Sequence, residues 1–348
     1  MKNNWGHVHW FLTGRCNLEC THCFRPKIGG KEDSGKIREL AEILRECAEK
    51  VSFTGGEPTL VRGFQDVLSS FKHKGVYISL HTNGISIDGK VSDLASLVDD
   101  IAVPLDSLDR ETQRFLKGRD YLPISLRVIN QVRAAGIDLG IHTVFNDTNA
   151  GHIPRIYRFL RKTGFSYWNV YEYNPDLVAD RFASCSRFQQ VRDLEGSCSY
   201  EKGGTDCLFA RFLETEDRIL RAGNKKVQFV SLRDVRPYTF LDSNGDVYFS
   251  VFFSGKRVKL GNLLEQGFDQ VNVARAEAIS KGLLFDEEGF VEIQNNLPFF
   301  ACLYEGNYWD EDVDGVDGRS WGKITRFHDL YVKRFYGEEE MKRAISVA

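Results

Sequence analysis

Residues 7–23 read HVHWFLTGRCNLECTHC, a short apolar run followed by three closely spaced cysteines. The run at residues 7–13 predicts a β-strand. Cys16, Cys20 and Cys23 follow it in a C-x3-C-x2-C pattern. This segment therefore predicts a strand that delivers three thiols to one edge of a sheet.

Helices and strands continue to alternate up to about residue 175. Helix-period runs follow short apolar runs, and Ser34 is the expected N-cap of the first helix. Six strands separated by helices predict right-handed βαβ units in a parallel sheet. Because six units are too few for a closed eight-stranded barrel, they predict an α/β fold with an open, partial (β/α)6 barrel. Further strands are expected at residues 51–54, 76–82, 101–105, 138–145 and 167–173, and helices at 34–50, 64–71, 94–98, 124–135 and 153–162.

The pattern changes beyond about residue 180. Strands are expected at residues 227–232, 239–241 and 247–253, and Asn244-Gly245 is typical of a hairpin turn. These signals predict a smaller, mainly antiparallel extension. The expected division is a barrel core at 1–180, a loop and helix connection at 181–225, and a C-terminal capping or substrate region at 226–348.

The composition excludes some classes of protein. The chain has 348 residues, with 46 basic and 49 acidic side chains, so no overall basic field favours nucleic acid as a partner. It contains no run of about 20 apolar residues that would predict a membrane span. Because the first residues also lack the apolar run of a signal peptide, we expect a cytoplasmic protein. There, clustered cysteines indicate metal ligands or catalysts rather than disulfides.

The three-cysteine loop suits an iron–sulfur cluster. Three thiolates can ligate three irons of a [4Fe–4S] cube, which leaves the fourth iron open for a substrate or cosubstrate. Zinc is the alternative, with His22 as a neighbouring ligand, but structural zinc sites commonly pair two cysteine motifs and no C-x2-C partner occurs elsewhere. A non-catalytic iron–sulfur protein is a second alternative, although it gives the open iron no task.

Two further motifs follow the next two strands. Residues 55–58 read Gly-Gly-Glu-Pro after the second strand, and residues 81–84 read His-Thr-Asn-Gly after the third. In a parallel barrel the carboxyl ends of all strands lie on one face, where catalytic sites are found. The motifs are therefore expected to meet the cysteines.

The cysteine motif and the Gly-Gly-Glu-Pro motif together resemble those of the radical S-adenosylmethionine (SAM) superfamily. The resemblance covers about residues 7–175. It implies that SAM binds the open iron of a [4Fe–4S] cluster and is cleaved reductively to a 5′-deoxyadenosyl radical, which abstracts a hydrogen from the substrate. It also implies an electron donor such as ferredoxin or flavodoxin.

The resemblance assigns roles to individual residues. Cys16, Cys20 and Cys23 match the cluster ligands. The other matching positions are implied SAM contacts: the methionine amino group at Gly55, Gly56, Glu57 and Pro58, the ribose at Thr82 and Asn83, the ribose or substrate at Asp106, the methionine carboxylate at Ser107 and Arg119, and the adenine at His22 and Phe24.

Several of these residues also have simple structural interpretations. Asn83-Gly84 could form only a tight turn, Ser107 or Asp106 could cap a helix, and Arg119 could lie on the surface. His7 and His9 alternate on the first strand and share one face, which favours packed or substrate-facing side chains over metal ligands. Cys47 is expected to be a packing residue.

A second cluster is a separate question. Cys185, Cys198, Cys207 and Cys302 are numerous enough for one, but their spacing is unlike that of compact ligand groups. Residues 240–250 resemble the hairpin of the auxiliary domain called SPASM or twitch, with Ser250 near the place of an expected cysteine. We therefore expect one cluster.

Two main substrate classes stay open, and an RNA-modifying enzyme is a third alternative that the lack of a basic domain disfavours. Blocks at residues 105–109, 143–149 and 168–172 resemble those of viperin-like enzymes, which implies dehydration of a nucleoside triphosphate. The degenerate hairpin and the Leu-Thr-Gly-Arg-Cys-Asn-Leu motif instead favour an enzyme of SPASM or twitch type that matures a peptide or a cofactor.

Overall fold

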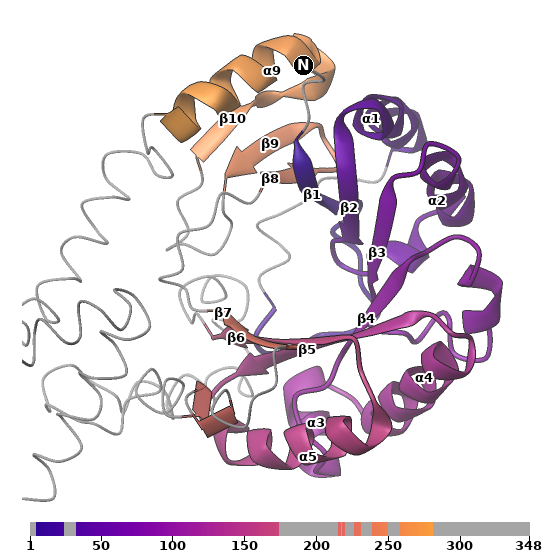
Figure 1. The fold of residues 1–348 in the computed structure, drawn as a ribbon, viewed down its shortest axis with the longest axis vertical. Coiled ribbons are helices and arrows are strands. Elements are labelled where there is room, and N and C mark those ends of the chain that lie inside the picture. Colours follow the sequence, from indigo (N-terminus) through magenta and orange to yellow (C-terminus); the bar gives the residue numbers. More distant parts are fainter. Residues whose placement is uncertain are drawn as a thin grey trace, which may run out of the picture.

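The computed structural model describes residues 5–23, 33–173, 215–216, 218–219, 226–230, 239–249 and 258–280. Its strands form one sheet in the order β10-β9-β8-β1-β2-β3-β4-β5-β6-β7 (Figure 1). The sheet curves into an arc. The strands are β1 (Gly6–Phe11), β2 (Ala48–Thr54), β3 (Tyr77–His81), β4 (Asp100–Pro104), β5 (Asp138–Phe145), β6 (Tyr167–Glu172), β7 (Val227–Val230), β8 (Thr239–Asp242), β9 (Asp246–Phe249) and β10 (Val258–Asn262).

Helices cover the outer, convex side of the arc (Figure 1). Those between β1 and β6 connect successive parallel strands, as expected for βαβ units. The helices are α1 (Ser34–Cys47), α2 (Phe64–Lys72), α3 (Arg110–Lys117), α4 (Leu122–Ala134), α5 (Ile153–Thr163) and α9 (Leu263–Ser280), with the short 3-10 helices η2 (Pro58–Leu60), η3 (Val91–Leu94) and η4 (Ala150–His152).

The partial barrel predicted from the sequence is confirmed, with one strand more than expected. β1 to β6 pair in parallel in chain order. β7 then pairs in parallel with β6, so its expected place in the antiparallel part was wrong. A strand only four residues long carries no signal that distinguishes the two pairings. The parallel part of the arc therefore gains a seventh strand.

The antiparallel extension lies at the other edge of the arc. β8 to β10 form an antiparallel group, and β8 attaches it in parallel to β1. The hairpin turn predicted at Asn244-Gly245 is present between β8 and β9, with Gly245 at φ 93°. The expected division at residues 180 and 225 stays a prediction, although all described strands share one sheet.

Several element boundaries differ from the sequence prediction, and three of these differences have a clear local description. The N-cap of α1 is Asp33 rather than Ser34, because the Asp33 carboxylate accepts hydrogen bonds from the backbone of Gly35 and Lys36. β2 begins at Ala48, three residues before the expected start. The helix expected at residues 94–98 is instead the 3-10 helix η3. Each shift is a local end effect that leaves the strand order unchanged.

The two faces of the arc differ in chemistry. Side chains alternate along each strand, and the outward set forms the apolar core with the helices, as Val8, Trp10 and Phe53 illustrate at 0% exposure. The opposite set includes His7, His9 and Ser79 and faces the concave side.

None of the helices in the part of the chain that the structure describes has the length and apolar character of a membrane span.

Candidate functional site

The three cysteines lie on the loop after β1, where the sequence placed them. Each is partly buried, and the backbone N–H of Cys23 donates a hydrogen bond to the carbonyl of Cys20 at 3.2 Å. The N–H of Leu18 points at the sulfur of Cys16 at 3.4 Å. Among the described residues, no three His, Cys, Asp or Glu side chains converge on one metal ion. A four-iron cube needs no such convergence, because each cysteine binds a different iron.

The Gly-Gly-Glu-Pro loop packs directly against the cysteine loop. The N–H of Gly56 donates to the Thr13 carbonyl at 2.5 Å, and the N–H of Glu57 donates to the Arg15 carbonyl at 2.7 Å. These bonds continue the β1–β2 pairing past the ends of both strands. A Cβ atom at Gly55 would lie 2.5 Å from the Thr13 oxygen, and one at Gly56 would lie 2.0 Å from the Arg15 oxygen. Only glycine therefore allows the two loops to approach this closely.

Glu57 joins this pair of loops to a third. Its Oε1 accepts hydrogen bonds from the hydroxyls of Thr59 and Thr82, each at 2.6 Å, and its Oε2 accepts the backbone N–H of Asn83 at 2.7 Å. Burial raises the pKa of the Glu57 carboxyl, against the opposing effect of these donors. The carboxylate thus fixes the positions of the loops after β2 and β3.

Asn83 links Glu57 to the cysteine loop. Its Nδ2 donates to Asn17 Oδ1 at 2.6 Å and lies 3.7 Å from the sulfur of Cys16. Its carbonyl accepts the hydroxyl of buried Tyr121 at 2.6 Å. The structure therefore assigns Asn83 more than a turn role, because it ties the cysteine loop to the start of α4.

A buried ion pair lies on the other side of the cysteine loop. Lys117, the last residue of α3, is 2% exposed and pairs with Asp106 Oδ2, which is 1% exposed. The Lys117 ammonium also lies 3.4 Å from Nε2 of His22. Asp106 Oδ1 accepts the N–H of Val144 at 2.8 Å, so the carboxylate is held from β5 as well.

These buried charges shift one another's protonation. Burial lowers the pKa of His22 to about 4, and Lys117 adds to this shift. Burial also raises the pKa of the Cys20 thiol to about 12, while Lys117 works against it. A neutral thiol is a poor nucleophile and a poor ligand, so Cys20 needs a cation to become a thiolate. Lys117 supplies part of that positive charge.

The other predicted site residues fall into two groups. Ser107 is buried, with its hydroxyl 2.6 Å from His152 Nδ1 and accepting the N–H of Asp109 at 2.9 Å. Asp109, not Ser107, is the N-cap of α3. Arg119 is exposed on the loop after α3, and Phe24 lies outside the described residues. The roles of these residues toward SAM stay predictions.

Sequence reasoning missed Lys117, Tyr121 and Asn17. Lys117 stands two positions before Arg119, and a lysine in a helical sequence normally indicates a solvated position. The signal that could have found it is spacing, since Gln113 and Lys117 are four residues apart on the face of α3 that turns toward the barrel. Tyr121 and Asn17 carry no signal that the sequence alone makes specific.

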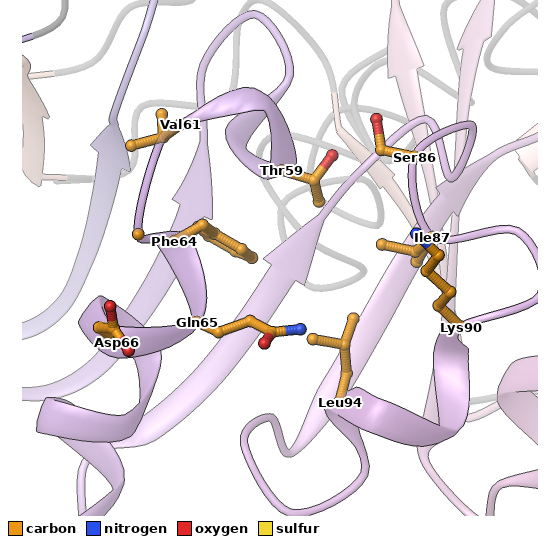
Figure 2. A pocket seen from close by; sticks show the side chains of 10 residues that line it. Thr59, Val61, Phe64, Gln65, Asp66, Ser86, Ile87, Lys90 and Leu94 are labelled. Carbon is orange, nitrogen blue, oxygen red and sulfur yellow. The ribbon is translucent and has the colours of Figure 1, made fainter.

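A pocket of about 360 Å³ lies behind the Gly-Gly-Glu-Pro loop (Figure 2). Thr59 lines it from one side and Ser86 and Lys90 from the other. Phe64 and Leu94 also line it and belong to the apolar core, which places the pocket on the helix side of the sheet. It shares no lining residue with the cysteine loop, although Thr59, which lines it, also donates a hydrogen bond to Glu57.

The chemistry of the site fits a [4Fe–4S] cluster with SAM. Three thiols share one short loop, a buried ammonium lies beside them, and glycine backbone lies against the loop. Nδ1 of His22 is buried and has no hydrogen-bond partner in the described part of the chain. Such an atom is costly unless a bound group satisfies it.

Comparisons with known proteins show the family of this chain. The sequence profile described as the Radical SAM superfamily matches residues 10–160. A probable GTP 3′,8-cyclase from Methanocella arvoryzae is 38% identical over 240 residues, which cover 62% of this chain and 76% of the cyclase. The mycofactocin maturase MftC of Mycobacterium ulcerans is 25% identical over 294 residues, 75% of this chain and 73% of the maturase. The chain spans about half the length of several other curated relatives that it matches.

Solved structures share the fold. Streptococcus suis SuiB bound to S-adenosylmethionine superposes with a TM-score of 0.56 at 17% identity, over 78% of this chain and 65% of SuiB. The structure of anSMEcpe with bound AdoMet and the Cp18Cys peptide gives a TM-score of 0.55 at 18% identity, over 98% and 99% of the two chains. The motifs, the sheet and the similarity to the cyclase together show that the chain belongs to the radical SAM superfamily and is a radical SAM enzyme.

Proposed function

We propose that Cys16, Cys20 and Cys23 hold a [4Fe–4S] cluster and that the surrounding loops bind SAM for reductive cleavage. The observation that carries this proposal is the junction at Glu57, whose carboxylate joins the Gly-Gly-Glu-Pro loop to Thr82 and Asn83. Through Asn83 the same junction reaches the cysteine loop. When bound, the cluster and SAM supply a 5′-deoxyadenosyl radical for hydrogen abstraction.

The residues of this chain orient SAM in the proposed site. The Gly55-Gly56 backbone offers carbonyl oxygens for the methionine amino group, while Glu57 keeps that backbone in place. Lys117 or Arg119 supplies the positive charge that the methionine carboxylate requires, and Ser107 adds a hydroxyl. His22 and Phe24 flank the adenine in this proposal, and Thr82, Asn83 and Asp106 stand near the ribose.

The proposed substrate is a nucleotide. The support is the similarity to the GTP 3′,8-cyclase, which extends over three quarters of that enzyme. The viperin-like sequence blocks at residues 105–109 and 143–149 give independent support, and they suggest dehydration of a nucleoside triphosphate.

A peptide- or cofactor-maturing reaction is the second candidate. The observation in its favour is that the similarity to the maturase MftC covers 75% of this chain, more than the cyclase similarity covers. The hairpin between β8 and β9 is the part of the described extension that resembles the SPASM or twitch scaffold.

Product formation from SAM separates these candidates. Anaerobically reconstituted protein is reduced with dithionite or with flavodoxin, and 5′-deoxyadenosine is quantified with each nucleoside triphosphate and with candidate peptides. Stimulation by one triphosphate supports the nucleotide proposal, while stimulation by a peptide alone contradicts it. If the wild type forms no 5′-deoxyadenosine under any condition while iron is bound, the SAM-cleavage proposal itself is wrong.

A further inference from the structure

The concave face of the barrel carries a layer of histidines below the proposed SAM site. His9 comes from β1, His81 from β3 and His142 from β5, three alternate strands. In a closed barrel such a layer from alternate strands is normally filled with branched aliphatic side chains. Here the layer is formed by three histidines, each of intermediate burial as a residue. We call these three residues the imidazole arc.

The rings of the arc form a continuous row. His9 and His81 have ring centroids 6.1 Å apart, and His81 and His142 lie edge to face at 4.6 Å. Phe240 on β8 stacks on His9 at 5.1 Å, and Tyr171 on β6 meets His142 at 5.3 Å. The row therefore spans the lumen from β8 to β6.

The arc lies immediately below the loops of the proposed SAM site. His81 directly precedes Thr82 and Asn83 in the chain. The carbonyl of His142 accepts the N–H of Leu105 at 2.9 Å, next to Asp106. A molecule resting on the arc would therefore face the loops where the radical is proposed to form.

The arc offers hydrogen bonds without charge. Burial is the main cause that lowers the pKa of all three imidazoles, to about 4 for His142, and Lys50 adds to each shift. The Lys50 charge is balanced by Asp100, whose Oδ2 lies 3.8 Å from the ammonium. Nε2 of His142 is buried without a hydrogen-bond partner among the described residues, an arrangement that leaves it ready for a ligand.

We propose that the imidazole arc binds the uncharged nucleoside part of a nucleotide substrate, with the phosphates outside the arc. The inference rests on the proposed function and names the part of the chain that selects the substrate. Neutral imidazoles donate and accept hydrogen bonds to base edges and ribose hydroxyls, and the ring faces stack on a base. A phosphate would meet neutral rings in this layer, and the nearby Lys50 ammonium is already balanced by Asp100.

The test measures binding without reduction or turnover. Guanosine, adenosine, cytidine and uridine, and their triphosphates, are titrated by calorimetry into the reconstituted holoprotein with SAM under anaerobic conditions. One nucleoside is expected to bind. His142→Phe and His81→Phe are expected to weaken that nucleoside and its triphosphate by the same factor of at least about tenfold, and His142→Gln to recover part of the loss.

The matched control is His73→Phe, which replaces an exposed histidine at the end of α2 and should leave binding unchanged. Equal iron content and circular dichroism show that each variant keeps its fold; if His142→Phe does not fold, His81→Phe decides. Failure of every nucleoside to bind the wild type overturns the inference, as does affinity that survives both substitutions. Either failure leaves SAM cleavage standing, since 5′-deoxyadenosine formation is measured separately.

Discussion

The loops at the carboxyl end of the barrel and the imidazole arc inside it satisfy their polar side chains in opposite ways. In the loops, Glu57 accepts several hydrogen bonds, Asn83 donates to Glu57 and Asn17, and Asp106 pairs with a buried lysine, so their positions are fixed before any ligand arrives. In the arc, neutral rings contact one another mainly through their faces and edges. The first arrangement suits one invariant cofactor, and the second suits a group recognised by a few hydrogen bonds.

Replacing a cysteine of the loop after β1 tests the cofactor role of the loops. It is expected to have the largest effect of the proposed substitutions. Cys20→Ala should abolish cluster retention and SAM cleavage. The loss in metal affinity or activity should exceed the roughly 100-fold seen when a residue that only hydrogen-bonds to a metal ligand is removed. Iron content and 5′-deoxyadenosine yield measure it, with Cys47→Ala as the control, because Cys47 is a buried packing residue of α1. Retained iron in the Cys20 variant would contradict the assignment.

Removal of Lys117 tests how strongly the loops depend on buried charge. Lys117→Met leaves the Asp106 carboxylate buried and unpaired, which should lower the free energy of unfolding by about 3–5 kcal/mol. Arg110→Met removes the cation of the exposed pair with Asp120 and should have a much smaller effect, because solvent screens that pair. Anaerobic urea unfolding measures both. Equal losses would mean that the buried pair is no more important than the surface one.

Gly56→Ala tests the contact between the two loops. Its Cβ would lie 2.0 Å from the Arg15 carbonyl, so the loops must separate, with an expected cost of about 1–3 kcal/mol and reduced iron content. Gly151→Ala is the matched control, because nothing lies within 4 Å of a Cβ there. Unfolding and iron analysis of the pair give the comparison. An unchanged Gly56 variant would show that close approach is not required.

The buried histidines of the arc should make the free energy of unfolding depend on pH. Because the pKa of His142 is about 4 when folded and about 6.5 when unfolded, the unfolded chain binds the extra proton between those values. The free energy of unfolding should therefore fall as pH falls from 6.5 to 4, by up to about 1.4 kcal/mol per pH unit for this residue. His142→Phe should flatten the curve relative to wild type. Identical curves would contradict a neutral His142.

The sequence predicted the parts of the fold that local patterns determine. Residues 138–145 form β5 with the bounds expected from their apolar run, and the two motifs meet the cysteine loop as parallel topology requires. The pairing of β7 depends on which edge of the sheet is available. That is a property of the whole sheet, which the four residues of β7 do not encode.

The sequence predicted the site residues that belong to recognisable motifs. It did not predict the residues whose role depends on being buried in the folded chain. Lys117 looks like a surface residue until α3 turns it toward Asp106. The alternation of β1 placed His7 and His9 on one face, but the arc also needs His81 and His142, which come together only through the stagger of alternate strands. Long-range packing of this kind leaves no local pattern in the sequence.

The most direct test of the proposed site is electron paramagnetic resonance of the reduced, reconstituted protein with and without SAM, together with iron and sulfide analysis. Cys16, Cys20 and Cys23 are predicted to hold one [4Fe–4S] cluster whose signal changes when SAM is added, and the signal should be absent from Cys20→Ala. Tightly bound zinc in place of iron, or a cluster signal that SAM leaves unchanged, would contradict the proposed chemistry.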